Sequence, residues 1–363
     1  MREYKLELLD KLGEGWVIDE NGVEIKIKSI PDDSRKGALD NRVLERTKKK
    51  MELVSSSLPQ NKEEDIEHIL LEEIRSQVGT PNIDLTENEI KIYNRLIKIK
   101  DHYINVHIYD GDSKSKDKKA VVFFHGGAFL GGSPKVLENQ SKLLAEKSKA
   151  VVIAPDYRLA PENPFPCGLE DCIGTVEWVH ENYEILGIDK NKIAVAGDSA
   201  GGNFATVCSL KDNKNIIKLL VIIYAGLDLT EVENTFYNWD YSLYDMFEEH
   251  KPYIINRLNR FVELSKVAGK LYNFQNRLSL NDPDLSPIKS NNLKNLPKTI
   301  IIEGEFDFFR ISNDVFAKQL KKDNVDVEVI RYLGMDHGFY DRLGTCPQTE
   351  DCIIEMAKAI ESL

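Results

Sequence analysis

A short apolar run that leads into a glycine-rich turn around a serine is the feature that most constrains this chain. Residues 193–202 read Ile-Ala-Val-Ala-Gly-Asp-Ser-Ala-Gly-Gly. The apolar half predicts a buried strand, and residues 203–207 predict a helix. Small residues surround Ser199 because a sharp turn from strand to helix crowds the backbone, which glycine tolerates at the lowest cost. Such a turn lifts a serine hydroxyl above the edge of a sheet.

The position predicted for Ser199 suits a nucleophile. At the start of a helix, the unpaired N–H groups and the helix dipole favour negative charge. An incidental serine in a glycine-rich turn is the alternative, and the G-x-S-x-G pattern by itself does not separate the two. Two further parts of the sequence favour the nucleophile.

The first of these parts is a buried-strand pattern at 120–124 that runs into the tripeptide His-Gly-Gly at 125–127. Two consecutive glycines after a strand leave backbone N–H groups bare, so that a carbonyl oxygen can reach them. We expect the N–H groups of Gly126, Gly127 and Ala200 to form an oxyanion hole. A plain strand-ending turn is the alternative here.

The second part is an acid and a base that follow two late strands. An apolar pattern at 298–302 is followed by Asp307, and another at 327–330 leads to His337. We expect His337 to take the proton of Ser199, and Asp307 to hold the imidazole in the required tautomer. The chain order Ser, Asp, His is that of the α/β-hydrolases.

Asp307 has close rivals in Glu303, Glu305 and Asp314. Glu303 comes too early, at the end of its strand, and Asp314 lies a full turn into the helix expected next. We therefore favour Asp307 as the acid. His337 alone among the seven histidines follows a late strand and precedes a glycine, which favours it as the base.

Strand and helix patterns alternate from about residue 89 onward. Eight strands are predicted, at 89–99, 103–110, 120–125, 150–155, 192–197, 219–225, 298–303 and 326–331. Helices are predicted near 135–148, 168–184, 200–211, 311–323 and 348–362. The first two strands should pair antiparallel across a short turn. Helices between the later strands imply a mostly parallel sheet that is covered on both faces, which is the α/β class.

Together these motifs resemble the hormone-sensitive-lipase family of α/β-hydrolases, a group of microbial carboxylesterases and their relatives. The matching signatures are HGGA at 125–128, DYRLAPE at 156–162, GDSAGG at 197–202, GEFD at 304–307 and DHGF at 336–339. The resemblance implies the α/β-hydrolase fold, with a mostly parallel eight-stranded sheet, helices on both faces and a cap. Ala128 stands where the family usually shows a third glycine.

The resemblance also implies a division of the chain. Residues 89–230 and 281–363 would form the catalytic domain, and 231–280 an aromatic-rich insertion that belongs to the cap. Residues 1–88 would be an N-terminal region that forms part of the cap.

Three local patterns stand out in the N-terminal region. The apolar runs at 15–18 and 23–27 predict a hairpin. Residues 63–78 predict an amphipathic helix. The Lys-rich stretch 47–50 is expected on the solvated surface.

Three residues near the motifs have no proton to transfer in this chemistry. Within DYRLAPE, Tyr157 and Arg158 are expected to give support, with Arg158 tying carboxylates or carbonyls and fixing the oxyanion loop. Asp198, beside the nucleophile, is expected to be structural.

Composition excludes several classes of protein. The net charge of −12, from 60 acidic and 48 basic residues, argues against a nucleic-acid partner and against adhesion to an anionic membrane. No stretch approaches the ~18 apolar residues that a membrane span needs, and no signal-peptide pattern is present. The five cysteines lack zinc-motif spacing and indicate reduced thiols in a cytoplasmic protein.

These observations predict a serine carboxylesterase that acts on small, uncharged esters through an acyl-enzyme, with no cofactor and no metal. The family resemblance implies short- to medium-chain acyl groups and leaves a homodimer open. An amidase or peptidase would use the same residues. A ligand-binding receptor on the same scaffold is the alternative from another class, but such family members lack the histidine that His337 supplies.

Overall fold

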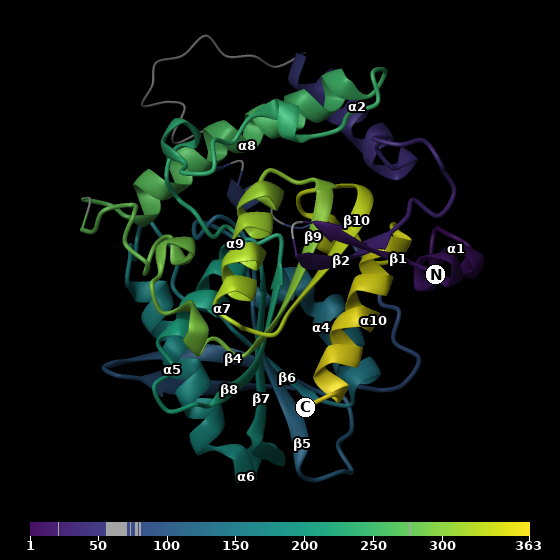
Figure 1. Cartoon of the computed structure of the whole chain (residues 1–363). Coiled ribbons are helices and arrows are strands. Elements are labelled where there is room, and N and C mark those ends of the chain that lie inside the picture. The colour runs from purple at the N-terminus through teal and green to yellow at the C-terminus, as the bar shows by residue number, and fades with distance from the viewer. Residues whose placement is uncertain (21, 56–70, 73, 77–78, 80, 276) are drawn as a thin grey trace.

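One sheet of ten strands runs through the molecule, and helices cover both of its faces (Figure 1). The computed structural model describes the whole chain except residues 21, 56–70, 73, 77–78, 80 and 276. The strands lie in the order β1-β2-β10-β9-β8-β7-β5-β6-β4-β3. Their bounds are β1 Trp16–Glu20, β2 Val23–Lys28, β3 Lys91–Ile99, β4 His102–Asp110, β5 Lys118–Phe124, β6 Val151–Pro155, β7 Ile188–Asp198, β8 Ile217–Ile223, β9 Lys298–Phe306 and β10 Val327–Asp336.

The eight predicted strands are all present, and the α/β fold class is confirmed. From β6 to β10 the neighbouring strands of the sheet pair in parallel, and β3 pairs antiparallel with β4 as expected. These central strands are continuous apolar runs because helices cover both sides of them.

The N-terminal hairpin is present, but it belongs to the sheet. Strand β2 pairs in parallel with β10, with Ile25 opposite Val329, so the sheet has ten strands and the prediction of eight is wrong. The physical reason is that Val23, Ile25 and Ile27 form a buried apolar stripe that packs into the main core.

The described helices are α1 Leu6–Gly13, α2 Asn41–Ser55, α4 Glu138–Ser148, α5 Cys167–Glu181, α6 Tyr183–Leu186, α7 Ala200–Leu210, α8 Lys251–Tyr272, α9 Arg310–Lys322 and α10 Pro347–Glu361. The described 3-10 helices are η1 Pro134–Leu137, η2 Val232–Asn234, η3 Tyr241–Leu243, η4 Pro287–Lys289, η5 Leu293–Asn295 and η6 Phe339–Asp341. Each of the five predicted helices matches one of these α-helices to within a few residues. The helix predicted at 63–78 falls mostly outside the described residues.

Two hydrophobic cores lie on opposite faces of the sheet because alternate side chains of each strand point in opposite directions. In β5, for example, Val122 joins the core with α5, α7 and α9, whereas Val121 joins the core with α4 and α10. All five cysteines are free thiols. Within the described part of the chain, no helix combines the length and apolar character that crossing a bilayer requires.

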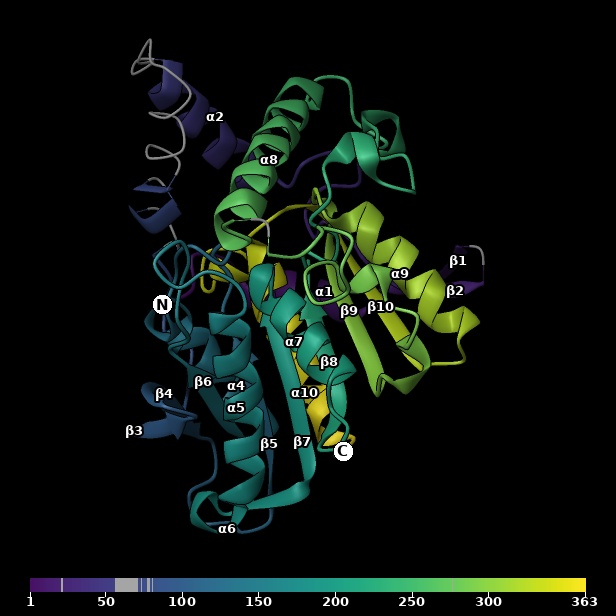
Figure 2. The ribbon, with the colours of Figure 1, turned by 90° about the vertical axis from the view of Figure 1, so that its left-hand side faces the viewer.

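Helices α2 and α8 lie side by side above the sheet, although about 200 residues separate them in the chain (Figures 1 and 2). Pro252 is the second residue of α8, in the first turn, where the backbone N–H groups have no partner within the helix. Ile254, Leu258 and Phe261 then follow at helical spacing and are buried underneath. The two helices therefore form a roof over the sheet.

Candidate active site

Ser199 occupies the turn between β7 and α7, in a backbone conformation that non-glycine residues seldom adopt. Its φ and ψ are 53° and −117°. Two backbone hydrogen bonds hold it there: its N–H donates to the carbonyl of Ile223 at 2.9 Å, and its own carbonyl accepts from the N–H of Gly226 at 3.1 Å. Strain held in this way at a single residue is typical of a nucleophile turn.

The glycines around Ser199 are required by close backbone approach. A Cβ atom on Gly197 would lie 2.3 Å from the carbonyl oxygen of Gly201. One on Gly201 would lie 2.0 Å from the carbonyl oxygen of Phe124. Both distances are shorter than any real contact. A side chain on Gly197 would push the end of β7 away from the first turn of α7, and one on Gly201 would push that turn away from strand β5.

The structure brings Ser199, Asp307 and His337 together at the carboxyl ends of three strands. The Nε2 atom of His337 lies 2.9 Å from Oγ of Ser199. The other ring nitrogen, Nδ1, lies 2.8 Å from Oδ2 of Asp307. Ser199 follows β7, Asp307 follows β9, and His337 follows β10. Because parallel strands end at the same edge of the sheet, residues far apart in the chain meet there.

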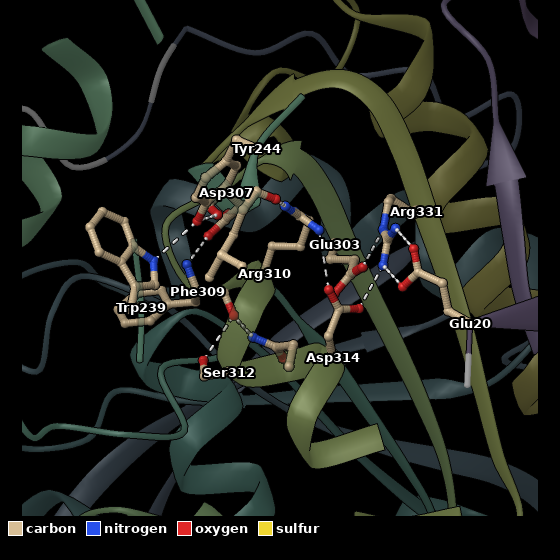
Figure 3. Close-up of polar contacts among 12 residues, drawn as sticks. Glu20, Trp239, Tyr244, Glu303, Asp307, Phe309, Arg310, Ser312, Asp314 and Arg331 are labelled. Carbon is tan, nitrogen blue, oxygen red and sulfur yellow. Dashed lines mark hydrogen bonds and ion pairs between the residues drawn. The ribbon is translucent and has the colours of Figure 1, made fainter. Parts of the chain in front are cut away.

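The carboxylate of Asp307 is fully buried and fixed from its other side (Figure 3). Its Oδ1 atom accepts a hydrogen bond from the N–H of Phe309 at 2.7 Å. The hydroxyl of Tyr244 donates to the Asp307 carbonyl at 2.9 Å. One carboxylate oxygen is thus anchored while the other faces the imidazole.

The rival acids have other partners. Arg331 binds Glu303 at 2.7 Å and Asp314 at 2.6 Å, and Figure 3 shows this cluster pointing away from Asp307. Glu305 accepts from the backbone N–H of Gly334 at 2.8 Å. Burial raises the pKa of both Glu303 and Glu305. Of the four candidates, only Asp307 contacts the histidine.

The loop after β5 differs from the prediction at one position. The N–H of Gly126 donates to Oδ1 of Asp198 at 2.7 Å, so it is not available to a substrate oxygen. The prediction of Gly126 as an oxyanion-hole donor is therefore contradicted. The N–H groups of Gly127, Ala128 and Ala200 have no acceptor among the described residues.

Tyr157, rather than Arg158, supports this loop. Its hydroxyl donates to the carbonyl of His125 at 2.5 Å, and the two rings stack with centroids 4.2 Å apart. Arg158 binds the carboxylate of Asp171 on α5 and the carbonyl of Cys167. Arg158 thus ties a carboxylate and a carbonyl as expected, but it does not touch the oxyanion loop.

Two hollows meet at Ser199. The larger, of about 170 Å³, is also lined by His337 and by residues of α2 and α8. The smaller, of about 40 Å³, is almost entirely apolar and is lined by Phe129, Leu229 and Phe309, among others. His337 lines only the larger hollow, so the two sides of Ser199 differ: one has the imidazole beside it, and the other is apolar.

Basic residues of the roof are functional candidates that were missed from the sequence. Arg46 and Lys50 of α2, with Arg257 and Arg260 of α8, line the larger hollow. The prediction that residues 47–50 form a solvated surface is wrong for Thr47, which is buried, whereas Lys48 and Lys50 are partly buried and Lys49 is exposed. Spacings of four and three residues place each basic pair on one helix face, and this was the signal available in the sequence.

Comparison with known proteins identifies the family. Residues 121–341 match the model of a family described by the alpha/beta hydrolase fold. The chain belongs to this α/β-hydrolase family, in its hormone-sensitive-lipase-like branch, as the motifs implied. The expected class of enzyme, a carboxylic ester hydrolase of esterase or lipase type, is confirmed with it.

Particular relatives have esterase and deacetylase names. The chain is 32% identical over 268 residues to an arylesterase from Saccharolobus solfataricus, covering 73% of this chain and 80% of the relative. It is 26% identical over 286 residues to the arylacetamide deacetylase of Bos taurus, covering 65% and 72%. Among solved structures, a hyperthermophilic esterase from Pyrobaculum calidifontis aligns with a TM-score of 0.68 at 28% identity, covering 90% of this chain and 98% of that one.

Proposed function

We propose that this protein is a serine carboxylesterase that hydrolyses short- to medium-chain esters through an acyl-enzyme. Ser199 attacks the ester carbonyl while His337 takes its proton and then passes it to the departing alcohol. Water, activated by the same imidazole, releases the acid. The observation that carries this proposal is the unbroken path from Ser199 through His337 to Asp307, with distances of 2.9 and 2.8 Å.

The backbone N–H groups of Gly127, Ala128 and Ala200 would stabilise the tetrahedral intermediate. None of the three groups has an acceptor in the part of the chain that the structure describes, and Gly127 and Ala128 line the hollow beside Ser199. Gly127 has φ 125° and Ala128 has φ 56°, which turns successive N–H groups out of the usual strand direction. Each such donor is worth about 2.7–4 kcal/mol of transition-state stabilisation in hydrolases of this kind.

The two hollows distinguish the acyl and alcohol sides of the ester. The departing alcohol must lie beside the imidazole that protonates it, and His337 lines only the larger hollow. The acyl group then occupies the apolar hollow of about 40 Å³, which suits short chains. The roof of α2 and α8 would limit water at the reacting carbonyl. This supports a cap that includes α2 from residues 1–88 and α8 from residues 231–280, whereas the β1–β2 hairpin belongs to the sheet.

Hydrolysis of 4-nitrophenyl esters from acetate to decanoate tests this proposal. We expect the highest kcat/KM at the short end and loss of activity in Ser199→Ala and His337→Ala. Ser115→Ala, which changes an exposed loop serine, is the matched control. Full activity of Ser199→Ala, or no hydrolysis of any ester by the folded protein, would refute the proposal.

Amide hydrolysis is a second candidate, favoured by the relative named arylacetamide deacetylase. It would use the same three side chains and differ in the protonation of the leaving nitrogen. Phenyl acetate and acetanilide form a matched pair that separates the two activities. A cytoplasmic location, a homodimer, and the absence of a nucleic-acid partner stay predictions.

A further inference from the structure

Four basic side chains lie where the hollow of about 170 Å³ beside Ser199 meets a neighbouring hollow of about 430 Å³. Arg46 and Lys50 come from α2, and Arg257 and Arg260 come from α8. The second hollow measures about 430 Å³, and these four residues are the ones that line both it and the hollow of Ser199. These four basic side chains therefore lie at the boundary between the two hollows.

Among the described residues that line the two hollows, the Lys and Arg side chains outnumber the Asp and Glu side chains. Arg46 and Lys50 form no hydrogen bond or ion pair with any described residue. Arg257 donates from Nε to Oδ2 of Asp336 at 3.0 Å, but Asp336 is shared with Arg342, which binds its Oδ1 at 2.5 Å. One carboxylate thus serves two guanidinium groups.

Three further acids among the described residues line the two hollows. Glu263, at the rim of the second hollow, is mostly exposed and lies 3.9 Å from Lys266. Asp198 and Asp341 also line the first hollow, and burial raises the pKa of both carboxyls. The Oδ1 atom of Asp198 accepts a hydrogen bond from the backbone N–H of Gly126.

The basic side chains repel one another. Burial, with the neighbouring Arg257, Arg46 and Arg260, lowers the pKa of Lys50 to about 8. Burial and Arg342 lower the pKa of Arg46 to about 10. The chain as a whole has a net charge of −12, so this concentration of positive charge opposes the general composition. Like charges gathered in a concave site attract ligands of the opposite sign.

We propose that Arg46, Lys50, Arg257 and Arg260 bind a carboxylate or similar oxyanion on the alcohol part of the ester. This inference rests on the proposed esterase function. It replaces the expectation of uncharged substrates with esters of a short acyl group and an anionic alcohol. The alcohol side is assigned because His337, which must protonate the leaving oxygen, lines the same hollow as the four basic residues. Guanidinium groups suit this role since they bind carboxylates in a two-pronged geometry.

The reaction itself is ordinary hydrolysis. The bond between the acyl carbon and the alcohol oxygen breaks, and the anionic alcohol leaves with the proton that His337 took from Ser199. Water then adds to the acyl-enzyme and restores the serine. The anionic group takes no part in the bond changes, so its effect should fall on binding and orientation.

The test compares 4-acetoxybenzoate with its neutral isostere 4-acetoxybenzamide. We expect wild-type kcat/KM to favour the carboxylate by at least about tenfold, the ratio that corresponds to 1.4 kcal/mol. The preference should weaken as salt is added. In the double variant Arg46→Gln, Lys50→Gln the ratio should fall about tenfold, mainly through a higher KM for the carboxylate. The matched control is Lys49→Gln, an exposed lysine of the same helix, which should keep the wild-type ratio.

Inhibition of the wild-type protein by the products gives a readout that needs no variant. We expect 4-hydroxybenzoate to compete more strongly than 4-hydroxybenzamide. Equal rates for the two esters with equal inhibition by the two products, or an unchanged ratio in the folded double variant, would overturn this inference. If 4-nitrophenyl acetate is still hydrolysed through Ser199, the proposed function survives that result. If none of the three esters is hydrolysed, the proposed function itself falls.

Discussion

The side chain of Asp198 accepts a hydrogen bond from the backbone N–H of Gly126, with 2.7 Å between Oδ1 and N, although 72 positions separate the two residues. Asp198 directly precedes Ser199, and Gly126 lies in the loop that carries Gly127 and Ala128. The bond therefore sets the distance between the serine hydroxyl and the proposed oxyanion hole. The fit is tight, since a Cβ atom on Gly126 would lie 2.4 Å from Oδ2 of Asp198.

Removing this bond should impair the reaction without removing a reacting group. We expect Asp198→Ala to lower kcat/KM about 10–100-fold, because misplacing the oxyanion loop weakens transition-state binding. Asp198→Asn should stay near the wild-type rate, since its amide oxygen can accept the same bond. Steady-state kinetics of both variants, with thermal unfolding to verify folding, would measure this. Equal rates for Asp198→Ala and the wild type would show that the bond is not needed.

The proposed acid of the triad, Asp307, can be distinguished from Glu303 by two isosteric changes. Asp307→Asn should lower kcat about 10³–10⁴-fold, because an amide cannot hold the imidazole in the right tautomer or stabilise its cation. Glu303→Gln should leave kcat close to the wild-type value, since Glu303 contacts Arg331 rather than His337. A large fall in kcat for Glu303→Gln, with Asp307→Asn still active, would reverse the assignment.

The ion cluster around Arg331 should affect stability rather than chemistry. Arg331 binds the buried Glu303 and Asp314 and the half-exposed Glu20. Arg331→Met would leave the buried Glu303 without its cation and Asp314 with Arg310 alone, so we expect a loss of about 3–5 kcal/mol of unfolding free energy. Denaturant unfolding would measure this loss. The triple variant that also changes Glu303→Gln and Asp314→Asn should regain part of it, and a triple variant less stable than the single one would contradict this account.

The charge on Lys50 should make stability depend on pH. Its pKa is lowered to about 8 from 10.5, so in this interval the unfolded chain binds a proton that the folded chain has lost. The contribution of Lys50 to stability therefore rises as the pH rises from about 8 to 10.5, and below that interval its charge destabilises the fold. We expect Lys50→Met to be more stable than the wild type at pH 7 by roughly 1 kcal/mol, after allowing for partial exposure.

The difference in unfolding free energy between Lys50→Met and the wild type should shrink towards pH 10. Denaturant unfolding of both proteins, in buffers without multivalent anions, would measure it. A difference between Lys50→Met and the wild type that does not vary with pH would show that burial and the neighbouring charges do not lower the pKa of Lys50.

The small apolar hollow should set the acyl-chain limit. Leu229 lines it and is buried, so Leu229→Ala would enlarge the space next to Ser199. We expect the preferred 4-nitrophenyl ester to shift towards longer chains, with a stability loss of about 2–5 kcal/mol. Kinetics across the acyl series would measure the shift. An unchanged chain-length profile in the folded variant would place the acyl group elsewhere.

The sequence is most informative where local rules govern the structure. Ser199, Asp307 and His337 could be predicted because each directly follows an apolar strand, and parallel strands end at one edge of the sheet. The role of Gly197 and Gly201 could also be predicted, because a sharp turn from strand to helix leaves no room for a Cβ atom at either position.

Longer-range features could not be predicted in this way. The pairing of β2 with β10 joins residues about 300 positions apart, and a hairpin pattern does not show which other strand it will pair with. The N–H of Gly126 was assigned to the oxyanion hole because a sequence does not show which way a peptide points or that Asp198 reaches it. The basic cluster arises only when α2 packs beside α8.

The central claim is that Ser199 is an activated nucleophile, and covalent labelling tests it most directly. Intact-mass and peptide analysis after treatment with a fluorophosphonate should find one adduct, on the peptide that contains Ser199, and none in Ser199→Ala. Folded protein that takes up no label, or takes it up equally in the Ser199→Ala variant, would contradict the account.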